Sequence, residues 1–404
     1  MMKFRRELPS LLSQTDVLLE IRDSRLPLTS INWNFEAPLR AWKTERGWDP
    51  QTPGQRNFKS LACEHIVVLN KRDLVPEWGL KPFHRAMETK FPEQRLVFSS
   101  MHKRRDVHAL IQMLVNIAKE HPHALGLNVL VIGMPNVGKS TLLNALRSLG
   151  LERKTPKALK TSAFPGLTQT VSNRLKLSLD PPVYAYDTPG VMLPFFGRGE
   201  EGAERGIKLA LIAGIKPGLY DIQDQAAYLL YRLNVLNPTS PAYLPLLPQD
   251  SAPVLELDEF LVLLATRMNM LKKGVHDVDR AAEYFVLWWR AKGSLIAAEK
   301  AQNLLQDFNV SSASNGSPVV RAQGWGFDLE WDVHPEDVAP EFNFETMVQK
   351  KMEGCIELYM NQMKKEEKEG GNLSDTQIRK MVMRDEKAKL KEKKMKKMKQ
   401  KWAQ

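Results

Sequence analysis

One eight-residue segment restricts the folds open to this chain more than any other part of its sequence. Residues 133–140 read Gly-Met-Pro-Asn-Val-Gly-Lys-Ser and match the phosphate-binding pattern G-x-x-x-x-G-K-[ST]. The apolar run 127–132 before it has the length of a buried parallel strand, and residues 141–146 after it read as the start of a helix. A strand, a glycine-rich turn and a helix N-terminus bring free N–H groups and the helix dipole onto an anion. The segment therefore predicts an α/β domain built around a phosphate site.

Each residue of this phosphate loop has an expected task. Lys139 is expected to reach the β- and γ-phosphates of a nucleotide and is a candidate catalytic residue, and the Ser140 hydroxyl is expected to bind Mg²⁺. The other residues of the loop that are predicted to bind the nucleotide are Asn136, Val137, Gly138 and Thr141. Because a strand and a helix flank the pattern, a chance match is the much weaker interpretation.

Two segments further along the chain fit the same site. Residues 187–190, Asp-Thr-Pro-Gly, follow a short strand predicted for residues 183–186. Asp187 is then a Mg²⁺ ligand at a strand end, and Gly190 frees a backbone N–H to approach the γ-phosphate, which makes it a candidate nucleotide-binding and catalytic residue. Thr168, between the two segments, is the candidate that completes the Mg²⁺ shell and takes part in catalysis, although most loop threonines only make turns.

The choice of base is predicted by a motif that precedes the phosphate loop. Residues 70–73, Asn-Lys-Arg-Asp, match N-K-x-D and follow a predicted strand at residues 65–69. The Asp73 carboxylate can accept hydrogen bonds from N1–H and the exocyclic amine of guanine, whereas adenine would leave this buried charge unpaired. A solvated charged turn is the alternative for this motif alone. The predicted base-binding residues are Asn70, Lys71 and Asp73, with Ser99 and Ser100 in the flanking turn after a further strand.

The order of these motifs along the chain is unusual. The base-reading motif precedes the phosphate loop and residues 187–190, whereas ordinary GTPases place it after them. Ahead of all three, a predicted strand leads into residues 23–27, Asp-Ser-Arg-Leu-Pro. With this element the chain resembles the circularly permuted GTPases of the YlqF/RbgA class, which carry D-A-R-x-P there, and Ser24 replaces the usual alanine. The resemblance extends from about residue 10 to about residue 295 and is greatest to the mitochondrial ribosome-assembly GTPases.

This resemblance implies a fold and a function. The implied fold class is α/β: a circularly permuted P-loop GTPase domain with a mostly parallel sheet flanked by helices, followed by an all-α C-terminal domain and a basic helical or disordered tail. The implied function is a GTPase that uses GTP and Mg²⁺ in assembly of the large ribosomal subunit. It would bind the ribosomal RNA (rRNA) of the precursor in its GTP state and leave after hydrolysis. Asn136 corresponds to the position that coordinates K⁺ in related GTPases, so K⁺ is a further expected cofactor.

Two features bear on the rate of hydrolysis. Val191 stands where Ras-like enzymes have a water-orienting glutamine, and a valine cannot position water by hydrogen bonding. We therefore expect slow intrinsic turnover that the ribosome stimulates, with water aligned by backbone groups near Thr168 and by K⁺. Members of the class usually begin with Trp-Phe-Pro-Gly-His-Met, whose histidine is implicated in catalysis, and this chain begins with Met1-Met2-Lys3 instead. Either the natural N-terminus lies upstream, or the protein hydrolyses GTP without that histidine.

Composition and charge limit the other classes of protein. With 404 residues and 43% hydrophobic content the chain can bury two domains, and its two cysteines, Cys63 and Cys355, argue against a disulfide framework or a zinc site. No apolar stretch approaches the roughly 18 residues of a membrane helix, which leaves peripheral membrane association open. The net charge is +11, and residues 379–401 carry twelve Lys or Arg against three acidic residues, a balance of +9. This basic tail is a candidate contact to RNA phosphates, with a solvated helix as the alternative.

The organisation along the chain is expected to have three parts. Residues 1–200 form the permuted GTPase domain, and residues 201–305 form a helical domain that is a candidate for rRNA binding. Residues 306–404 comprise a linker, an acidic segment at 326–345 without a functional interpretation, and the basic tail. Aromatic residues of the helix predicted for 279–295 are expected in the core rather than stacked on bases.

The compartment and two rival functions complete the expectations. A mitochondrial location, in the matrix with inner-membrane association as an option, is implied by the family alone, because the first strand leaves almost no room for a cleavable presequence. The first rival is a nucleolar or cytosolic GTPase of the same class that acts on the pre-60S particle. The second is a scaffold that GTP switches on and off with negligible hydrolysis.

Overall fold

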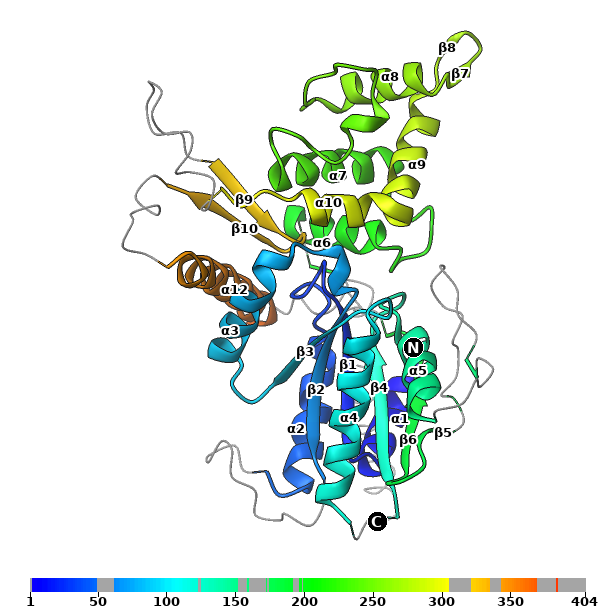
Figure 1. Cartoon of the computed structure of the whole chain (residues 1–404), viewed down its shortest axis with the longest axis vertical. Helices are drawn as coiled ribbons and strands as arrows, with labels where there is room; N and C mark the ends of the chain where they lie inside the picture. Colours follow the sequence, from blue (N-terminus) through cyan, green and yellow to red (C-terminus); the bar gives the residue numbers. More distant parts are fainter. Residues whose placement is uncertain are drawn as a thin grey trace, which may run out of the picture.

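A six-stranded sheet lies in the lower half of the computed structural model as drawn in Figure 1, below a region of helices. The structure describes residues 2–48, 62–122, 125–151, 158–159, 172, 174–191, 196–197, 199–304, 321–334, 343–368 and 383. The strands are β1 (Val17–Asp23), β2 (Glu64–Asn70), β3 (Arg95–Ser99), β4 (Leu127–Gly133), β5 (Leu175–Ser178) and β6 (Val183–Asp187). Their order across the sheet is β3-β2-β1-β4-β6-β5, and only β5 runs antiparallel to its neighbour.

The position of β4 in this order confirms the predicted circular permutation. β4 leads into the phosphate loop and lies in the middle of the sheet, with β1, β2 and β3, which precede it in sequence, on one side. The strands that follow it, β6 and β5, lie on the other side. The residues of β4 are buried because helices cover both faces of the sheet, as is usual for parallel sheets. We call this α/β unit the G domain.

Helices cover both faces of the sheet (Figure 1). On one face lie α4 (Arg104–Glu120) and α5 (Lys139–Gly150), and on the other lie α1 (Met2–Ser13), α2 (Glu36–Glu45) and α3 (Leu80–Lys90). Short 3-10 turns occur at Trp33–Phe35, Arg72–Leu74 and Glu77–Gly79. α4 buries Val107, Leu110, Ile111, Leu114 and Ile117, which recur at the spacing of one helix face. Burial of such faces against the strands holds the layers together.

A helical region follows the G domain, as predicted. Its elements are α6 (Gly199–Leu211), α7 (Ile222–Leu236), a 3-10 turn (Leu244–Leu246), α8 (Leu257–Arg267), the small hairpin β7 (Leu271–Lys272) and β8 (Val275–His276), α9 (Val278–Trp288), a π-helical turn (Trp289–Gly293) and α10 (Ser294–Lys300). Phe285, Trp288 and Trp289 are buried, which confirms that these aromatics belong to the core. Tyr243 and Phe260 pack against Phe285 with ring centroids 6.3 and 4.5 Å away.

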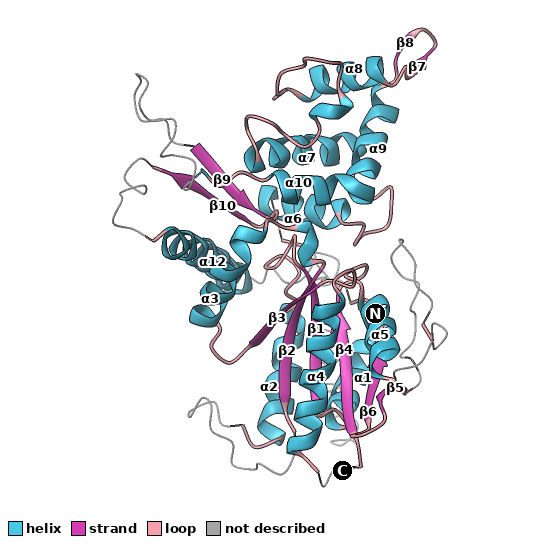
Figure 2. Cartoon of the chain, viewed as in Figure 1, coloured by secondary structure: helices cyan, strands magenta, loops and turns pink. Residues whose placement is uncertain are grey.

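Residues 321–334 and 343–368, which fall in the part expected to be a linker, an acidic segment and a tail, contain two strands and a helix. They form an antiparallel hairpin of β9 (Arg321–Trp325) and β10 (Leu329–Val333), followed by the long helix α12 (Phe344–Lys368), which lies beside α3 (Figure 2). The acidic residues of β10 alternate with the buried Leu329, Trp331 and Val333. This period of two is typical of a half-buried strand. The acidic composition of this segment therefore did not reveal that it contains a strand, β10, with one buried face.

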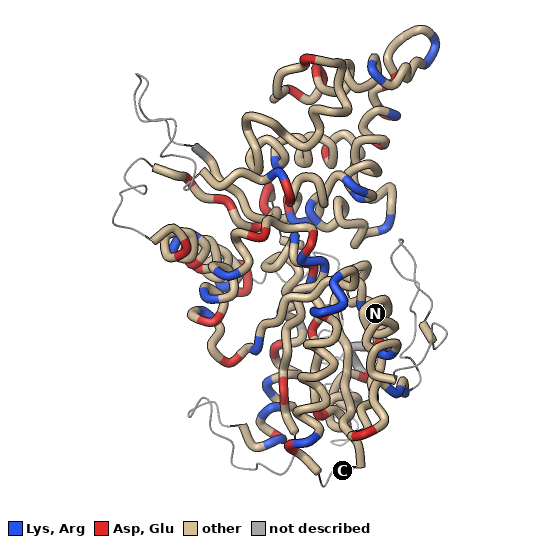
Figure 3. The backbone as a smooth tube through the Cα atoms, in the orientation of Figure 1, with Lys and Arg blue, Asp and Glu red and all other residues tan. Residues whose placement is uncertain are grey.

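Charged residues of both signs are interspersed over the described chain, and they lie close together where the G domain meets the helical region (Figure 3). The basic tail from residue 379 onward lies outside the described residues, Met383 excepted, so its predicted RNA contact stays a prediction. Within the described ranges, no helix combines the length and the apolar character that a membrane crossing requires.

Candidate functional site

The strand register brings the predicted site residues to one edge of the sheet. Asp23 pairs with Asn70, and Asn70 pairs with Ser99, so the ends of β1, β2 and β3 are level. Gly133 ends β4 beside β1, and Asp187 ends β6 on the other side of β4. Because these strands are parallel, their carboxyl ends share one edge, where α/β proteins bind ligands.

The base-reading motif and the phosphate loop bond to each other directly. The Asn70 Nδ2 donates to the Val137 carbonyl at 2.8 Å, and the Lys71 Nζ donates to the Asn136 carbonyl at 2.7 Å. Gly138 lies between them with φ of +93°, and a Cβ there would be 2.5 Å from the Asn70 Nδ2. Only glycine satisfies both the left-handed backbone and this close approach. The two motifs, distant in sequence, therefore form one structural unit.

Lys139 is folded back onto its own loop. Its Nζ donates to the carbonyls of Gly133 at 3.1 Å and Met134 at 2.8 Å. The side chain is buried, and this burial lowers its pKa to about 8, even though the Asp187 carboxylate favours the charged form. An ammonium held by two neutral carbonyls is poorly compensated, so a phosphate in the loop would supply the missing negative charge.

Ser140 and Asp187 form the pair expected of two Mg²⁺ ligands. The Ser140 hydroxyl donates to the Asp187 Oδ2 at 2.5 Å, and the Asp187 Oδ1 is buried without a hydrogen-bond partner among the described residues. Burial raises the pKa of this carboxyl, while the Ser140 hydrogen bond and the Lys139 charge oppose the rise. A hydroxyl and a carboxylate with spare acceptor capacity fit Mg²⁺, which prefers oxygen ligands.

Gly190 packs tightly against the phosphate loop. A Cβ on this residue would lie 2.7 Å from both the backbone N and Cα of Pro135, so no larger residue fits without a shift of that loop. The next residue, Val191, donates its N–H to the Gly133 carbonyl at 3.1 Å and is buried against the helices α1 and α2. The backbone that leaves β6 is thus held beside the phosphate loop, while the Val191 side chain points into the core.

The base-binding end of the site contains three buried polar atoms without partners in the described part of the chain. They are Oδ1 of Asn70, Oδ1 of Asp73 and Oγ of Ser99. Asp106 on α4 holds the loops that carry them: it accepts two hydrogen bonds from Arg72, at 2.5 and 2.9 Å, and one from the Ser100 N–H at 3.0 Å. We did not predict Asp106 from the sequence, because nothing in the local pattern links it to a residue 34 positions earlier.

A second group that the sequence analysis did not assign to the site lies at the end of β1. Asp23 accepts hydrogen bonds from Arg25, at 2.9 Å from Nε and 2.8 Å from Nη2, and its Oδ2 lies 3.0 Å from the Lys71 Nζ. Burial would raise the pKa of Asp23, but the charges of Arg25 and Lys71 outweigh it and hold the pKa well below its usual range. The Asp-Ser-Arg motif therefore orients the lysine of the base-reading motif. Ser24 bonds to the Asn70 carbonyl at 2.8 Å.

The roles of two predicted cation ligands, Asn136 and Thr168, stay predictions. The Asn136 Nδ2 donates to the Ile212 carbonyl at 2.8 Å, so this side chain connects the phosphate loop to the end of α6. This contact leaves the proposed role of its Oδ1 toward K⁺ as a prediction. Thr168 lies outside the described residues, and its predicted roles toward Mg²⁺ and in catalysis also remain predictions. Thr141 is in the first turn of α5, beside Ser140, as expected.

Comparisons with known proteins agree with this geometry. The family described as 50S ribosome-binding GTPase matches residues 128–234. Mitochondrial GTPase 1 of Schizosaccharomyces pombe is 30% identical over 312 residues, which cover 72% of this chain and 84% of that protein. Mitochondrial ribosome-associated GTPase 1 of Mus musculus is 29% identical over 242 residues, which cover 58% of this chain and 65% of the mouse protein.

Among solved structures, GNP-bound YlqF from T. maritima aligns with a TM-score of 0.42 and 20% identity, over 74% of this chain and 94% of that one. The permuted strand order, the joined base and phosphate motifs and the match over most of the fission-yeast protein all point to one group of proteins. The chain belongs to the family of circularly permuted GTPases that includes the mitochondrial GTPase 1 proteins.

Proposed function

We propose that this protein binds and hydrolyses GTP in assembly of the large ribosomal subunit of mitochondria. The observation that carries the nucleotide part is the buried Oδ1 of Asp73, which has no partner among the described residues although it lies at the end of the base-reading motif. An unpaired buried carboxylate oxygen is costly, and guanine supplies the N–H donors that would satisfy it. Adenine has an acceptor at N1 and no amine at C2, so the site selects GTP over ATP.

The residues at the phosphate end divide the chemistry among them. Lys139 exchanges its two carbonyl acceptors for phosphate oxygens, and the N–H of Gly190 approaches the γ-phosphate. Ser140, Asp187 and Thr168 would hold Mg²⁺, and the bound ion would supply positive charge opposite the phosphates. The nucleotide-binding set is completed by the loop residues 136–138 and Thr141, and by Ser99 and Ser100 beside the base.

Hydrolysis is expected to be slow without a partner. Water must be oriented for attack on the γ-phosphate, and the buried Val191 side chain offers no hydrogen bond for this purpose. The attacking water is then oriented by backbone groups near Thr168. The charge that develops on the phosphates is stabilised by a K⁺ held by Asn136 and by the ribosome. If the protein leaves the ribosomal precursor only after it has hydrolysed GTP, the precursor controls its own release by stimulating hydrolysis.

The ribosomal part of the proposal is supported by the relatives and by charge. The mouse relative is named a mitochondrial ribosome-associated GTPase. The helical region and the basic tail are the candidate rRNA contacts, and the tail alone carries +9 of the net +11. Because α6 directly follows the segment after β6 and its end is bonded to Asn136, movement at Gly190 and in the phosphate loop would reach the helical region.

A single-turnover assay of GTP hydrolysis tests the proposal. The protein is mixed with radiolabelled GTP, with and without purified mitochondrial large subunits, in K⁺ and in Na⁺. We expect a slow rate alone and a faster rate with subunits in K⁺. A fast rate that needs neither K⁺ nor subunits contradicts the mechanism. Binding without hydrolysis under all four conditions would favour the scaffold, and fractionation of the tagged protein separates the mitochondrial from the nucleolar or cytosolic alternative.

A further inference from the structure

The β9–β10 hairpin is anchored firmly on the G domain. The Trp325 ring stacks on Phe83 of α3 with centroids 4.8 Å apart, and its Nε1 donates to the Pro76 carbonyl at 2.9 Å. Trp325 is fully buried, and a Cβ added to Gly79 would lie 2.2 Å from its ring. A buried, hydrogen-bonded tryptophan fixes the position of the strand that carries it.

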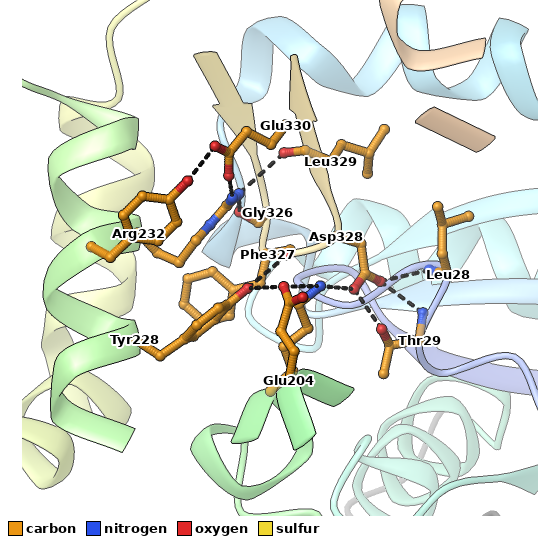
Figure 4. A network of polar contacts seen from close by, with 12 residues as sticks. Leu28, Thr29, Glu204, Tyr228, Arg232, Gly326, Phe327, Asp328, Leu329 and Glu330 are labelled. Atoms are coloured by element: carbon orange, nitrogen blue, oxygen red, sulfur yellow. Dashed lines mark hydrogen bonds and ion pairs between the residues drawn. The ribbon is translucent and has the colours of Figure 1, made fainter. Parts of the chain in front are cut away.

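The tip of this hairpin binds the loop that follows β1. The Phe327 N–H donates to the Arg25 carbonyl at 2.8 Å, and Gly326 adopts a φ of +61° so that the turn can approach. The Asp328 Oδ2 accepts hydrogen bonds from the N–H groups of Leu28 and Thr29, both at 2.8 Å, and its Oδ1 accepts one from the Thr29 hydroxyl at 2.6 Å (Figure 4). One buried carboxylate therefore holds three donors of the loop.

This loop, residues 24–32, lies between the two ends of the nucleotide site. On its N-terminal side, Asp23 is bonded to the Lys71 Nζ of the base-reading motif. On its C-terminal side, the Asn32 Nδ2 donates to the Val191 carbonyl at 3.3 Å, directly after Gly190. A displacement of the loop would therefore move both Lys71 of the base-reading motif and the backbone at Val191, directly after Gly190.

The hairpin is also tied to the helical region, chiefly through Glu330 and Arg232. Glu330 binds Arg232 and Tyr231 of α7, and Lys208 of α6 lies 3.6 Å from the Asp328 Oδ1 (Figure 4). Arg232 also donates to the hairpin carbonyls of residues 326 and 329 at 2.9 and 3.1 Å. The Glu330 carboxylate binds side chains of α7, whereas the Asp328 carboxylate binds the loop of the nucleotide site as well as Lys208.

We propose that Asp328 is a positioning residue for the guanine nucleotide: by fixing residues 24–32 it holds Lys71 and the Val191 backbone in their binding geometry. The inference rests on the proposed nucleotide site and adds a residue that does not itself touch the nucleotide. It also assigns a task to the acidic segment. Without the hydrogen bonds of Asp328, the site is no longer preorganised for the nucleotide, so bound nucleotide dissociates faster.

The test compares three variants of the full chain. Asp328→Asn removes the charge and one acceptor oxygen at nearly constant volume. Glu330→Gln weakens the tie to α7 and leaves the loop contacts in place, and Asp332→Asn changes an exposed residue on the same strand. The release of fluorescent mant-GDP into excess GDP is measured by stopped flow, and the Tm of each variant is measured in parallel. We expect release about tenfold faster for Asp328→Asn, within the usual range of coupling between sites, and near wild type for the other two.

A double-mutant cycle separates positioning from general loosening. Thr29→Val removes one hydroxyl that bonds Asp328 and is mild enough to preserve the fold. We expect it to accelerate release about threefold, with Asp328→Asn plus Thr29→Val no faster than Asp328→Asn alone, since residues in contact are not additive. A lowered Tm with unchanged release in Asp328→Asn overturns the inference, as does equal acceleration by Glu330→Gln at equal Tm. If the wild-type chain binds no mant-GDP, the proposed function itself has failed, which is a distinct result.

Discussion

The Ser140 hydroxyl lies 2.5 Å from the Asp187 carboxylate and donates a hydrogen bond to it. The two residues are 47 positions apart, and the parallel register of β4 and β6 is what brings them together. The second carboxylate oxygen of Asp187 is buried and has no partner in the described part of the chain. The pair therefore fits the proposed Mg²⁺ site, because a hydroxyl and a carboxylate with spare acceptor capacity are oxygen ligands of the kind that Mg²⁺ prefers.

Loss of the Ser140 hydroxyl should remove the effect of Mg²⁺ on nucleotide binding. For Ser140→Ala we expect mant-GDP to dissociate roughly 10- to 100-fold faster in Mg²⁺, because the loss of one interaction with a charged group has an effect of this size. In EDTA, where no Mg²⁺ is bound, we expect an unchanged rate. Ser148→Ala, an exposed serine on the same helix, is the matched control. A wild-type response to Mg²⁺ in Ser140→Ala would exclude this residue as a ligand.

Affinity for GTP should fall as the pH rises above the pKa of Lys139. Burial holds that pKa at about 8 in the free protein, and bound phosphates favour the charged form, so binding above pH 8 takes up a proton. We expect the Kd for mant-GTP to rise by up to about tenfold per pH unit between pH 8 and 9 and to be flat between pH 6.5 and 7.5.

An arginine provides the control for this pH dependence. Lys139→Arg stays charged over the whole range, so its Kd should be higher throughout and lack the rise contributed by the lysine. The same rise in both proteins would assign the titration to another group, such as the base itself.

Base selection should change when Asp73 loses its charge. Asp73→Asn replaces one acceptor oxygen by an amide donor, which repels the guanine amine and matches the 2-carbonyl of xanthine. We expect GTP affinity to fall by about 10- to 100-fold and XTP to become the preferred nucleotide. Competition of XTP and GTP against mant-GDP measures both effects, and Glu77→Gln, an exposed neighbour, should leave them unchanged. Equal weakening toward both nucleotides would indicate a collapsed loop rather than a base reader.

The hairpin should contribute strongly to the stability of the G domain. Trp325→Ala removes a fully buried ring that stacks on Phe83 and fills the space beside Gly79. We expect it to lower the free energy of unfolding by about 3–5 kcal/mol in urea denaturation. Leu358→Ala on α12, where the side chain is 72% exposed, should change it by less than about 0.5 kcal/mol. Similar values for both variants would show that the hairpin is not part of the cooperative unit.

The phosphate loop and the base-reading motif were predictable because their chemistry is local. Gly138 must adopt a left-handed backbone, and Lys139 and Ser140 must follow it directly, so the pattern is visible in consecutive residues. The strands β2 and β4 were predictable for a similar reason, since burial on both faces requires short, continuous apolar runs, and β6 was predictable from its β-forming residues. Motif order alone also indicated the permuted topology.

The supporting residues were decided only by the tertiary structure. Asp106 orients Arg72 from 34 positions away, and Asp328 reaches Leu28 and Thr29 across about 300 positions. No local pattern marks such contacts, because a carboxylate at the end of a turn looks the same whether it faces water or three buried donors. The residues expected to bind the nucleotide are close neighbours in sequence within each motif. The residues that hold these motifs in place come from distant elements, and which elements pack together is decided only when the whole chain has folded.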